Sequence, residues 1–108
     1  MPLRLATQVT GTFVALAALA SWSAADAQDD AAALQTAVLA GSCANCHGTD
    51  GHSPGAIPSL AGKKEEDLLK ALTAFKQGKA KVTVMTRLAK GYTDEQLAAL
   101  AHYFATRE

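Results

Sequence analysis

The chain has 108 residues, its ten basic and ten acidic side chains give a formal net charge of zero, and 49% of its residues are hydrophobic. This length leaves room for one small domain, and the balanced charge gives no reason to expect a nucleic-acid partner. Aromatic residues make up only 6% of the chain, so they contribute little material for a core.

The first 27 residues have the order of a secretory signal peptide. They contain a basic residue, an apolar core and a small-x-small cleavage pattern: Arg4, Phe13 to Ala20, and Ala25 to Ala27. We expect cleavage before Gln28, a periplasmic location and no membrane contact after cleavage. An uncleaved anchor is the alternative, but a spanning helix needs about 20 apolar residues, and the strongly apolar core is shorter.

Residues 28–108 would then form one domain close to the size, roughly 70–80 residues, below which a single core seldom suffices without a staple. An alanine-rich run predicts a first helix from about Ala31 to Cys43, with Asp29 or Asp30 as its cap. From Gly48 to Gly62 the chain carries four glycines and two prolines, which predict a loop.

A second helix is predicted within residues 63–78, where Gly78 supplies the stop and one apolar stripe is formed by Leu68, Leu69, Leu72 and Phe75. A basic segment around Met85 follows and is expected to be irregular. The last helix opens with a capping box, Thr93 followed three residues later by Gln96. Its apolar face consists of Leu97, Leu100, Ala101 and Phe104.

Charge is unevenly distributed along the chain. The segment from Lys63 to Lys90 carries eight basic residues against three acidic ones. Such a segment is a candidate docking face for an acidic partner, contributed by Lys79, Lys81, Arg87 and Lys90. The alternative is an ordinary solvated face.

The motif Cys43-Ala44-Asn45-Cys46-His47 admits four interpretations. A disulfide across two residues removes little loop entropy. A structural zinc site needs four ligands, and no third cysteine is present. A thioredoxin-like redox pair needs a βαβ context, which this alanine-rich chain does not offer. Covalent haem attachment requires this pattern, with each thiol added to a vinyl group and the histidine on the iron.

One haem c also supplies the missing apolar core. His47 would bind the iron through one ring nitrogen, and its other nitrogen needs an acceptor. The carbonyl of Pro58, on the loop eleven residues later, is a candidate; the alternative is that Pro58 merely stiffens the loop.

The candidates for the second axial ligand are Met85, His52, His102 and lysine side chains. His52 lies too close in sequence to His47 to reach the opposite face of the macrocycle, and His102 lies beside the apolar face of the last helix. Met85 is the one methionine of residues 28–108. A lone methionine is commonly core filler, but beside a haem motif it predicts His/Met ligation, which raises the reduction potential.

These residues resemble a class I c-type cytochrome over nearly all of residues 28–108. The stretches CANCHGTDGHSPGAIPSLAG and VTVMTRLAKGYTDEQLAALAHYFA are similar to the cytochrome subunit of flavocytochrome c sulfide dehydrogenase. The resemblance implies an all-α fold, with three main helices and loops wrapped around one haem. It also implies that Cys43 and Cys46 hold the haem and that His47 and Met85 are axial. Some members of that family carry two haem domains, whereas this chain has one motif.

The implied function is periplasmic electron transfer by a protein that is not itself an enzyme. Its implied partners are an FAD-containing sulfide dehydrogenase subunit and a downstream redox protein. One alternative is a freely diffusing carrier between a reductase and a terminal oxidase. Another, of a different class, is a haem enzyme or gas sensor in which Met85 stays off the iron.

Overall fold

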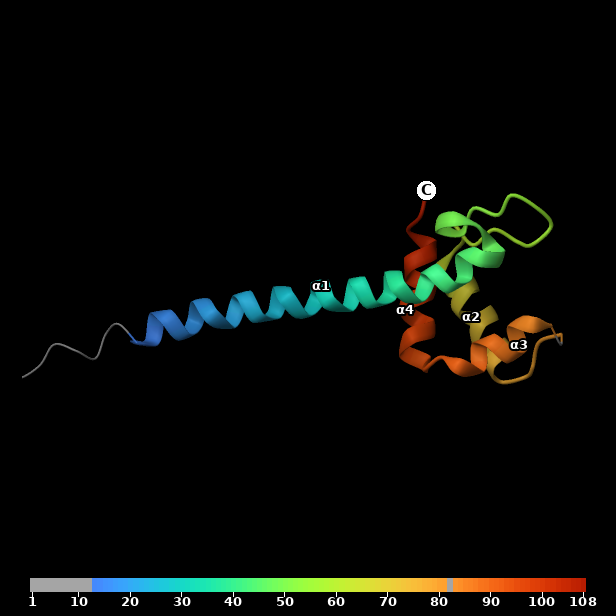
Figure 1. Ribbon diagram of the computed structural model, residues 1–108. Helices are drawn as coiled ribbons and strands as arrows, with labels where there is room; N and C mark the ends of the chain where they lie inside the picture. The colour runs from blue at the N-terminus through green and yellow to red at the C-terminus, as the bar shows by residue number, and fades with distance from the viewer. Residues whose placement is uncertain (1–12, 82) are drawn as a thin grey trace, which may run out of the picture. The chain divides into compact units, whose positions relative to one another are not determined.

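A computed structural model describes residues 13–81 and 83–108 of the chain (Figure 1). Within these residues every regular element is helical, which confirms the all-α prediction. The chain divides into two units, residues 1–33 and 34–108. The start of the predicted signal peptide, including Arg4, lies outside the described residues. No helix in the described ranges combines the length and the apolarity needed to cross a membrane.

Helix α1 (Phe13–His47) is longer than the sequence analysis predicts at both ends. Asp29 and Asp30 lie inside it, so their prediction as caps is wrong for the full chain. The reason is that residues 13–40 contain neither glycine nor proline and are rich in alanine, the residue with the highest helix propensity. The helix also continues past Cys43 to His47.

Helices α2 (Glu65–Lys76) and α4 (Asp94–Ala105) pack against each other and form most of the core of residues 34–108 (Figure 1). The apolar face predicted for the last helix is confirmed, since all four of its residues are buried. On α2, Leu68 is buried and Leu69 and Leu72 pack against the core. Helix α1 contributes Ala40 to the same cluster.

The ends of these two helices follow their sequence signals. The side chain of Thr93 accepts a hydrogen bond from the backbone of Gln96, and the Gln96 side chain accepts one from the backbone of Thr93. Gly78, just beyond α2, has φ of 69°, the left-handed conformation that stops a helix. Both predictions are therefore confirmed.

The segment around Met85 is not irregular, contrary to the sequence prediction. It forms a short helix, α3 (Val84–Leu88), followed by the 3₁₀ turn η2 (Ala89–Gly91), and both pack against α2. A second capping box explains this order: Thr83 accepts from the Met85 backbone at 3.2 Å, and the buried Thr86 side chain accepts from the Thr83 backbone at 3.3 Å. These bonds satisfy amides at the start of the helix that would otherwise be unpaired.

The loop between α1 and α2 contains the 3₁₀ turn η1 (Thr49–Gly51) and is fixed by backbone hydrogen bonds. The amide of Leu60 donates to the Gly51 carbonyl at 2.8 Å, and the amide of Gly62 donates to the Phe104 carbonyl at 3.1 Å. Gly51 is buried with φ of 80°, and a Cβ there would lie 2.8 Å from Phe104 Cδ1. This close approach requires glycine.

Candidate functional site

The last turn of α1 carries both cysteines and the adjacent histidine of the attachment motif. Cys43 and Cys46 are one turn apart on the helix, and so are Cys43 and His47, so the three side chains share one helical face. Both thiols are free; Cys46 is exposed, whereas Cys43 is half-buried and packs against the core. A single helical turn thus presents two thiols and an imidazole together.

The environment of Cys43 favours its protonated form. Burial raises the pKa of the Cys43 thiol above its ordinary value, and hydrogen-bonding contacts with Ser42 and with the Cys43 backbone lower it by less than burial raises it. Near neutral pH the group is therefore a thiol and not a thiolate.

The side chain of His47 is oriented by the loop that follows it. Its Nδ1 lies 2.6 Å from the carbonyl oxygen of Pro58. A carbonyl only accepts hydrogen bonds, so Nδ1 carries the proton and donates. In the neutral ring Nε2 then has no proton, and its lone pair is available to a metal ion. Pro58 is the residue that the sequence analysis nominates as the acceptor.

Met85 lies on a different element from the motif, in the first turn of α3, and its side chain is half-buried. Its backbone amide donates to the Thr83 side chain in the capping box, and the helix that carries it packs against α2. A thioether is a soft ligand, suited to haem iron.

The apolar surface in these segments fits a flat apolar cofactor. Ile57, beside Pro58, is 43% exposed, and Val84 and Leu88, one turn apart on α3, are 64% and 50% exposed. Exposing large apolar side chains to water is unfavourable, and covering them with an apolar macrocycle removes that cost. The residues present therefore fit a covalently held haem.

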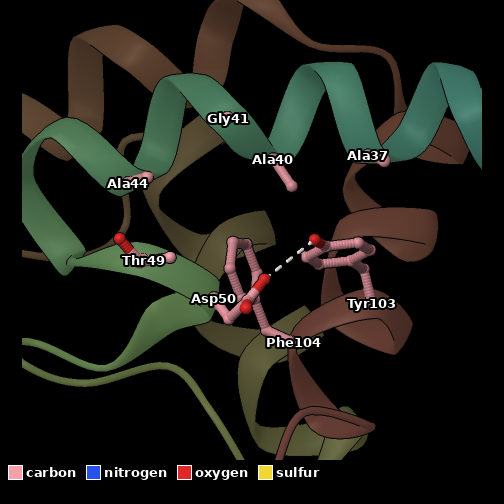
Figure 2. Close-up of a pocket in the computed structure, with 8 residues that line it drawn as sticks. All are labelled: Ala37, Ala40, Gly41, Ala44, Thr49, Asp50, Tyr103 and Phe104. Carbon is pink, nitrogen blue, oxygen red and sulfur yellow. Dashed lines mark hydrogen bonds between the residues drawn. The ribbon is translucent and has the colours of Figure 1, made fainter.

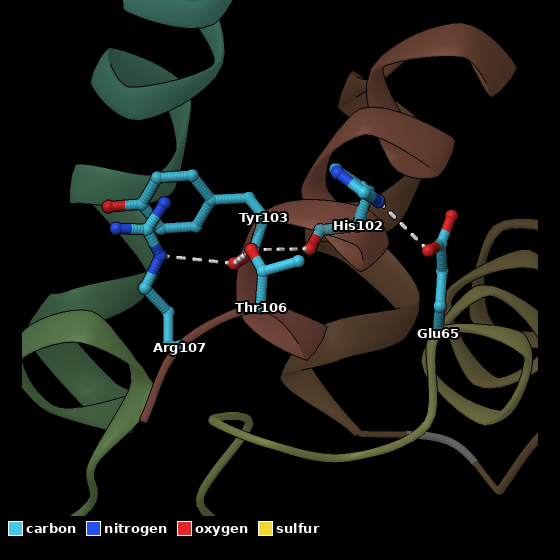
Figure 3. A network of polar contacts seen from close by, with 5 residues as sticks. All are labelled: Glu65, His102, Tyr103, Thr106 and Arg107. Atoms are coloured by element: carbon cyan, nitrogen blue, oxygen red, sulfur yellow. Dashed lines mark hydrogen bonds and ion pairs between the residues drawn. The ribbon is translucent and has the colours of Figure 1, made fainter.

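The other candidate ligands have different partners. His52 Nε2 lies 2.7 Å from the backbone oxygen of Glu108. His102 Nδ1 lies 2.9 Å from Glu65 Oε2, joining α4 to the start of α2 (Figure 3). In the described part of the chain, no group of three or more His, Cys, Asp or Glu side chains is arranged to hold a metal ion.

The polar contacts beyond His102 close the C-terminal end of α4 (Figure 3). The guanidinium of Arg107 lies 3.8 Å from the centre of the Tyr103 ring, and its Nε donates to the Tyr103 carbonyl at 3.1 Å. The hydroxyl of Thr106 donates to the carbonyls of His102 and Tyr103. This network stabilises the helix end and does not involve the predicted site.

A pocket of about 160 Å³ lies between the C-terminal part of α1 and α4 (Figure 2). Its lining consists of Ala37, Ala40, Gly41, Ala44, Thr49, Asp50, Tyr103 and Phe104. Figure 2 shows the Tyr103 hydroxyl directed at Asp50, to which it donates at 3.3 Å. None of the five residues predicted for the site lines this pocket.

One contact near the site has no signal in the local sequence. The hydroxyl of Tyr92 lies 2.9 Å from Ser42 Oγ, fifty residues away and adjacent to Cys43. Sequence reasoning missed both residues, together with the exposed pair Val84 and Leu88.

Comparison with known proteins gives a family match over the whole of this region. The model of the family described as "Cytochrome c" matches residues 31–108. The cytochrome subunit of sulfide dehydrogenase from Chlorobaculum tepidum is 52% identical over 67 residues, which cover 62% of this chain and 61% of that protein.

Two other relatives are cytochromes of different length. Cytochrome c4 of Pseudomonas aeruginosa is 45% identical over 78% of this chain and 41% of its own length. Cytochrome c-554(548) of Halomonas halodenitrificans is 36% identical over 63% of this chain and 87% of its own length. The matches thus span less than two thirds of the first two relatives and most of the third.

Proposed function

We propose, because this chain belongs to the cytochrome c family, that residues 28–108 form one haem-c domain in which Cys43 and Cys46 hold the haem and His47 and Met85 bind its iron. Proteins of this family transfer electrons, and the iron supplies reversible one-electron chemistry. The single observation that carries the assignment is the 2.6 Å contact between His47 Nδ1 and the Pro58 carbonyl, in the turn that also presents both thiols.

Each residue has a distinct role in this proposal. The thiols of Cys43 and Cys46 fix the position of the cofactor, and the Pro58 carbonyl fixes the orientation of His47. Met85 supplies the thioether from α3. Two protein ligands leave no open position on the iron, which favours an electron carrier over the alternative, an enzyme or gas sensor.

An absorption spectrum of the oxidised protein tests the ligand set. The weak near-infrared sulfur-to-iron band should be present in the wild-type protein and absent from Met85→Ala. A wild-type spectrum without this band would favour the open-site alternative.

We further propose that residues 1–27 direct the chain to the periplasm, where it accepts electrons as the cytochrome subunit of a sulfide-oxidising flavoprotein complex. The support is the 52% identity with a relative named the cytochrome subunit of sulfide dehydrogenase; the flavoprotein partner follows from the family resemblance. Oxidation of sulfide to sulfur releases two electrons, and a one-haem chain accepts one at a time. The subunit must therefore pass the first electron to a downstream redox protein before it accepts the second.

A freely diffusing carrier is the second candidate. It is supported by the match that covers 87% of cytochrome c-554(548), whose name specifies no complex. Such a carrier needs the same cofactor and ligands, so site chemistry does not separate the two candidates.

Purification from the native periplasm distinguishes them. The complex predicts a co-purifying flavin-containing protein and reduction of the cytochrome when sulfide is added. An unrelated cytochrome serves as the control for direct reduction by sulfide. A lone monomer that sulfide reduces no faster than this control would contradict the complex and favour the free carrier.

A further inference from the structure

We infer that the hydrogen bond between Tyr92 and Ser42 holds the Met85 segment, residues 84–91, against helix α1, which carries the attachment motif. This makes Tyr92 a positioning residue for the axial methionine. The inference rests on the ligands proposed above. Ser42 directly precedes Cys43 at the end of α1, and Tyr92 directly follows η2, the turn after the helix that carries Met85. The 2.9 Å contact therefore joins the two halves of the site.

The direction of this hydrogen bond follows from the number of protons available. Ser42 Oγ lies 2.8 Å from the Leu39 carbonyl, which only accepts, so the single serine proton is used there. Tyr92 must then donate its own proton to Ser42 Oγ. Replacing Tyr92 by phenylalanine removes this donor and leaves an aromatic ring to pack against the core, as the Tyr92 ring does.

The Met85 segment has few internal means of holding its position. Helix α3 has five residues, far fewer than a helix needs to be stable by itself. The side-chain hydrogen bonds of Thr83 and Thr86 stay within its own capping box. The Tyr92 bond, in contrast, reaches a different helix.

Two contacts restrain the C-terminal end of this segment in different ways. Lys76 at the end of α2 forms an ion pair of 2.7 Å with Asp94 at the start of α4. This pair joins the two helices that flank the segment, and it does not involve α1. Tyr92 lies between these two helices in the sequence, and its hydrogen bond connects the segment to Ser42, the residue before Cys43. Only the second contact bears directly on the distance between the methionine segment and the attachment turn.

A ligand that competes with Met85 for the iron measures this effect. Imidazole binds where the methionine has left, so its apparent affinity rises with the population of the methionine-free form. A hydrogen bond that is made in the ligated form and broken in the other shifts this population by about three- to tenfold. Tyr92→Phe and Ser42→Ala should therefore bind imidazole about three- to tenfold more tightly than the wild type.

The experiment uses the oxidised holoprotein and four variants: Tyr92→Phe, Ser42→Ala, their double variant, and Tyr103→Phe as the matched control. The control loses a tyrosine hydroxyl that donates to Asp50 at 3.3 Å, in the pocket between α1 and α4. Its imidazole affinity should match that of the wild type. The double variant should show no more than the larger single effect, because both changes remove the same bond between Tyr92 and Ser42.

Amide hydrogen exchange supplies a readout independent of ligand binding. Exchange in residues 84–91 should be faster in Tyr92→Phe than in the control, while the α4 core exchanges at equal rates. Ser42→Ala keeps the test available if Tyr92→Phe does not fold.

Two results would overturn the inference. One is an imidazole affinity of both Tyr92→Phe and Ser42→Ala within twofold of wild type. The other is an equal shift in Tyr103→Phe, which would show general loosening of the fold. A wild-type holoprotein without the sulfur-to-iron band would instead contradict the proposed methionine ligand itself, and this inference with it.

Discussion

Gly48 packs directly against the backbone of His52, since a Cβ atom at position 48 would lie 1.9 Å from the His52 carbonyl oxygen. Gly48 also has φ of +84° and immediately follows His47. We expect Gly48→Ala to lower the free energy of unfolding by about 3 kcal/mol or more, because it combines left-handed strain with a backbone clash. Denaturant unfolding of the holoprotein, followed by circular dichroism, measures this change.

Gly55→Ala is the control for that substitution. Nothing lies within 4 Å of a Cβ at Gly55, and its φ is not positive. Its free energy of unfolding should stay within about 1 kcal/mol of wild type. Equal losses in both variants would contradict the steric explanation.

The core prediction concerns Leu97 on α4, whose side chain is 1% exposed. Leu97→Ala should destabilise the protein by about 2–5 kcal/mol, because it leaves a cavity in a close-packed region. Leu34→Ala, at a side chain that is 67% exposed, should change stability by no more than about 0.5 kcal/mol. Thermal and denaturant unfolding of both variants check this difference; a small loss at Leu97 would show that the core is loosely packed.

Thr93 provides a test of helix capping. Thr93→Ala removes the acceptor for the Gln96 amide and should cost about 1 kcal/mol of stability. Thr93→Ser keeps a hydroxyl and should cost less than half as much. If the alanine and serine variants were equally stable, the hydroxyl would not be responsible for the effect.

Substitution of Met85 is expected to change the reduction potential. The thioether ligand raises the potential, so Met85→Ala should lower it by on the order of 0.1 V, within the roughly 0.8 V that axial ligands span. Val84→Ala, at the neighbouring exposed position, should retain the sulfur-to-iron band. Redox titration followed by absorbance measures both variants, and an unchanged potential in Met85→Ala would contradict the proposed ligand.

The candidate docking face gives a prediction about salt. Lys79, Lys81, Arg87 and Lys90 are all exposed. Electron-transfer rates with an acidic partner should fall as ionic strength rises, because salt screens charges beyond a Debye length of about 8–10 Å. Lys81→Glu should slow the reaction at low ionic strength and make its rate less dependent on salt. Rates that stay flat with salt would indicate an ordinary solvated face.

Local signals explain how much of this fold could be predicted from the sequence. The capping box at Thr93 and the apolar spacing from Leu97 to Phe104 involve residues within one helix, so α4 was predictable. Helix α3 was missed because its box pairs Thr83 with Thr86 instead of with Glu or Gln, and because five residues are too few to show a periodicity. The early start of α1 reflects the absence of any breaker from Phe13 to Ala40.

The candidate site also combines features that have a local sequence signal with features that have none. The spacing of Cys43, Cys46 and His47 places them in one turn, and the loop composition made Pro58 a reasonable acceptor eleven residues away. The contact between Ser42 and Tyr92 spans fifty residues, and only tertiary packing brings such pairs together. Met85 was likewise proposed as a ligand from its chemistry, without a prediction of the helix that carries it.

The end of α1 at His47 has an electrostatic consequence for a bound iron. Aligned peptide dipoles give the C-terminal end of a helix a partial negative charge of about one half. His47 belongs to that last turn, so the field of α1 would act on an iron held by the imidazole and would favour its more positive, oxidised state. This field would lower the reduction potential, whereas the proposed thioether ligand from α3 would raise it. The two helices that would carry the axial ligands would therefore have opposite effects on the potential at which the protein exchanges electrons.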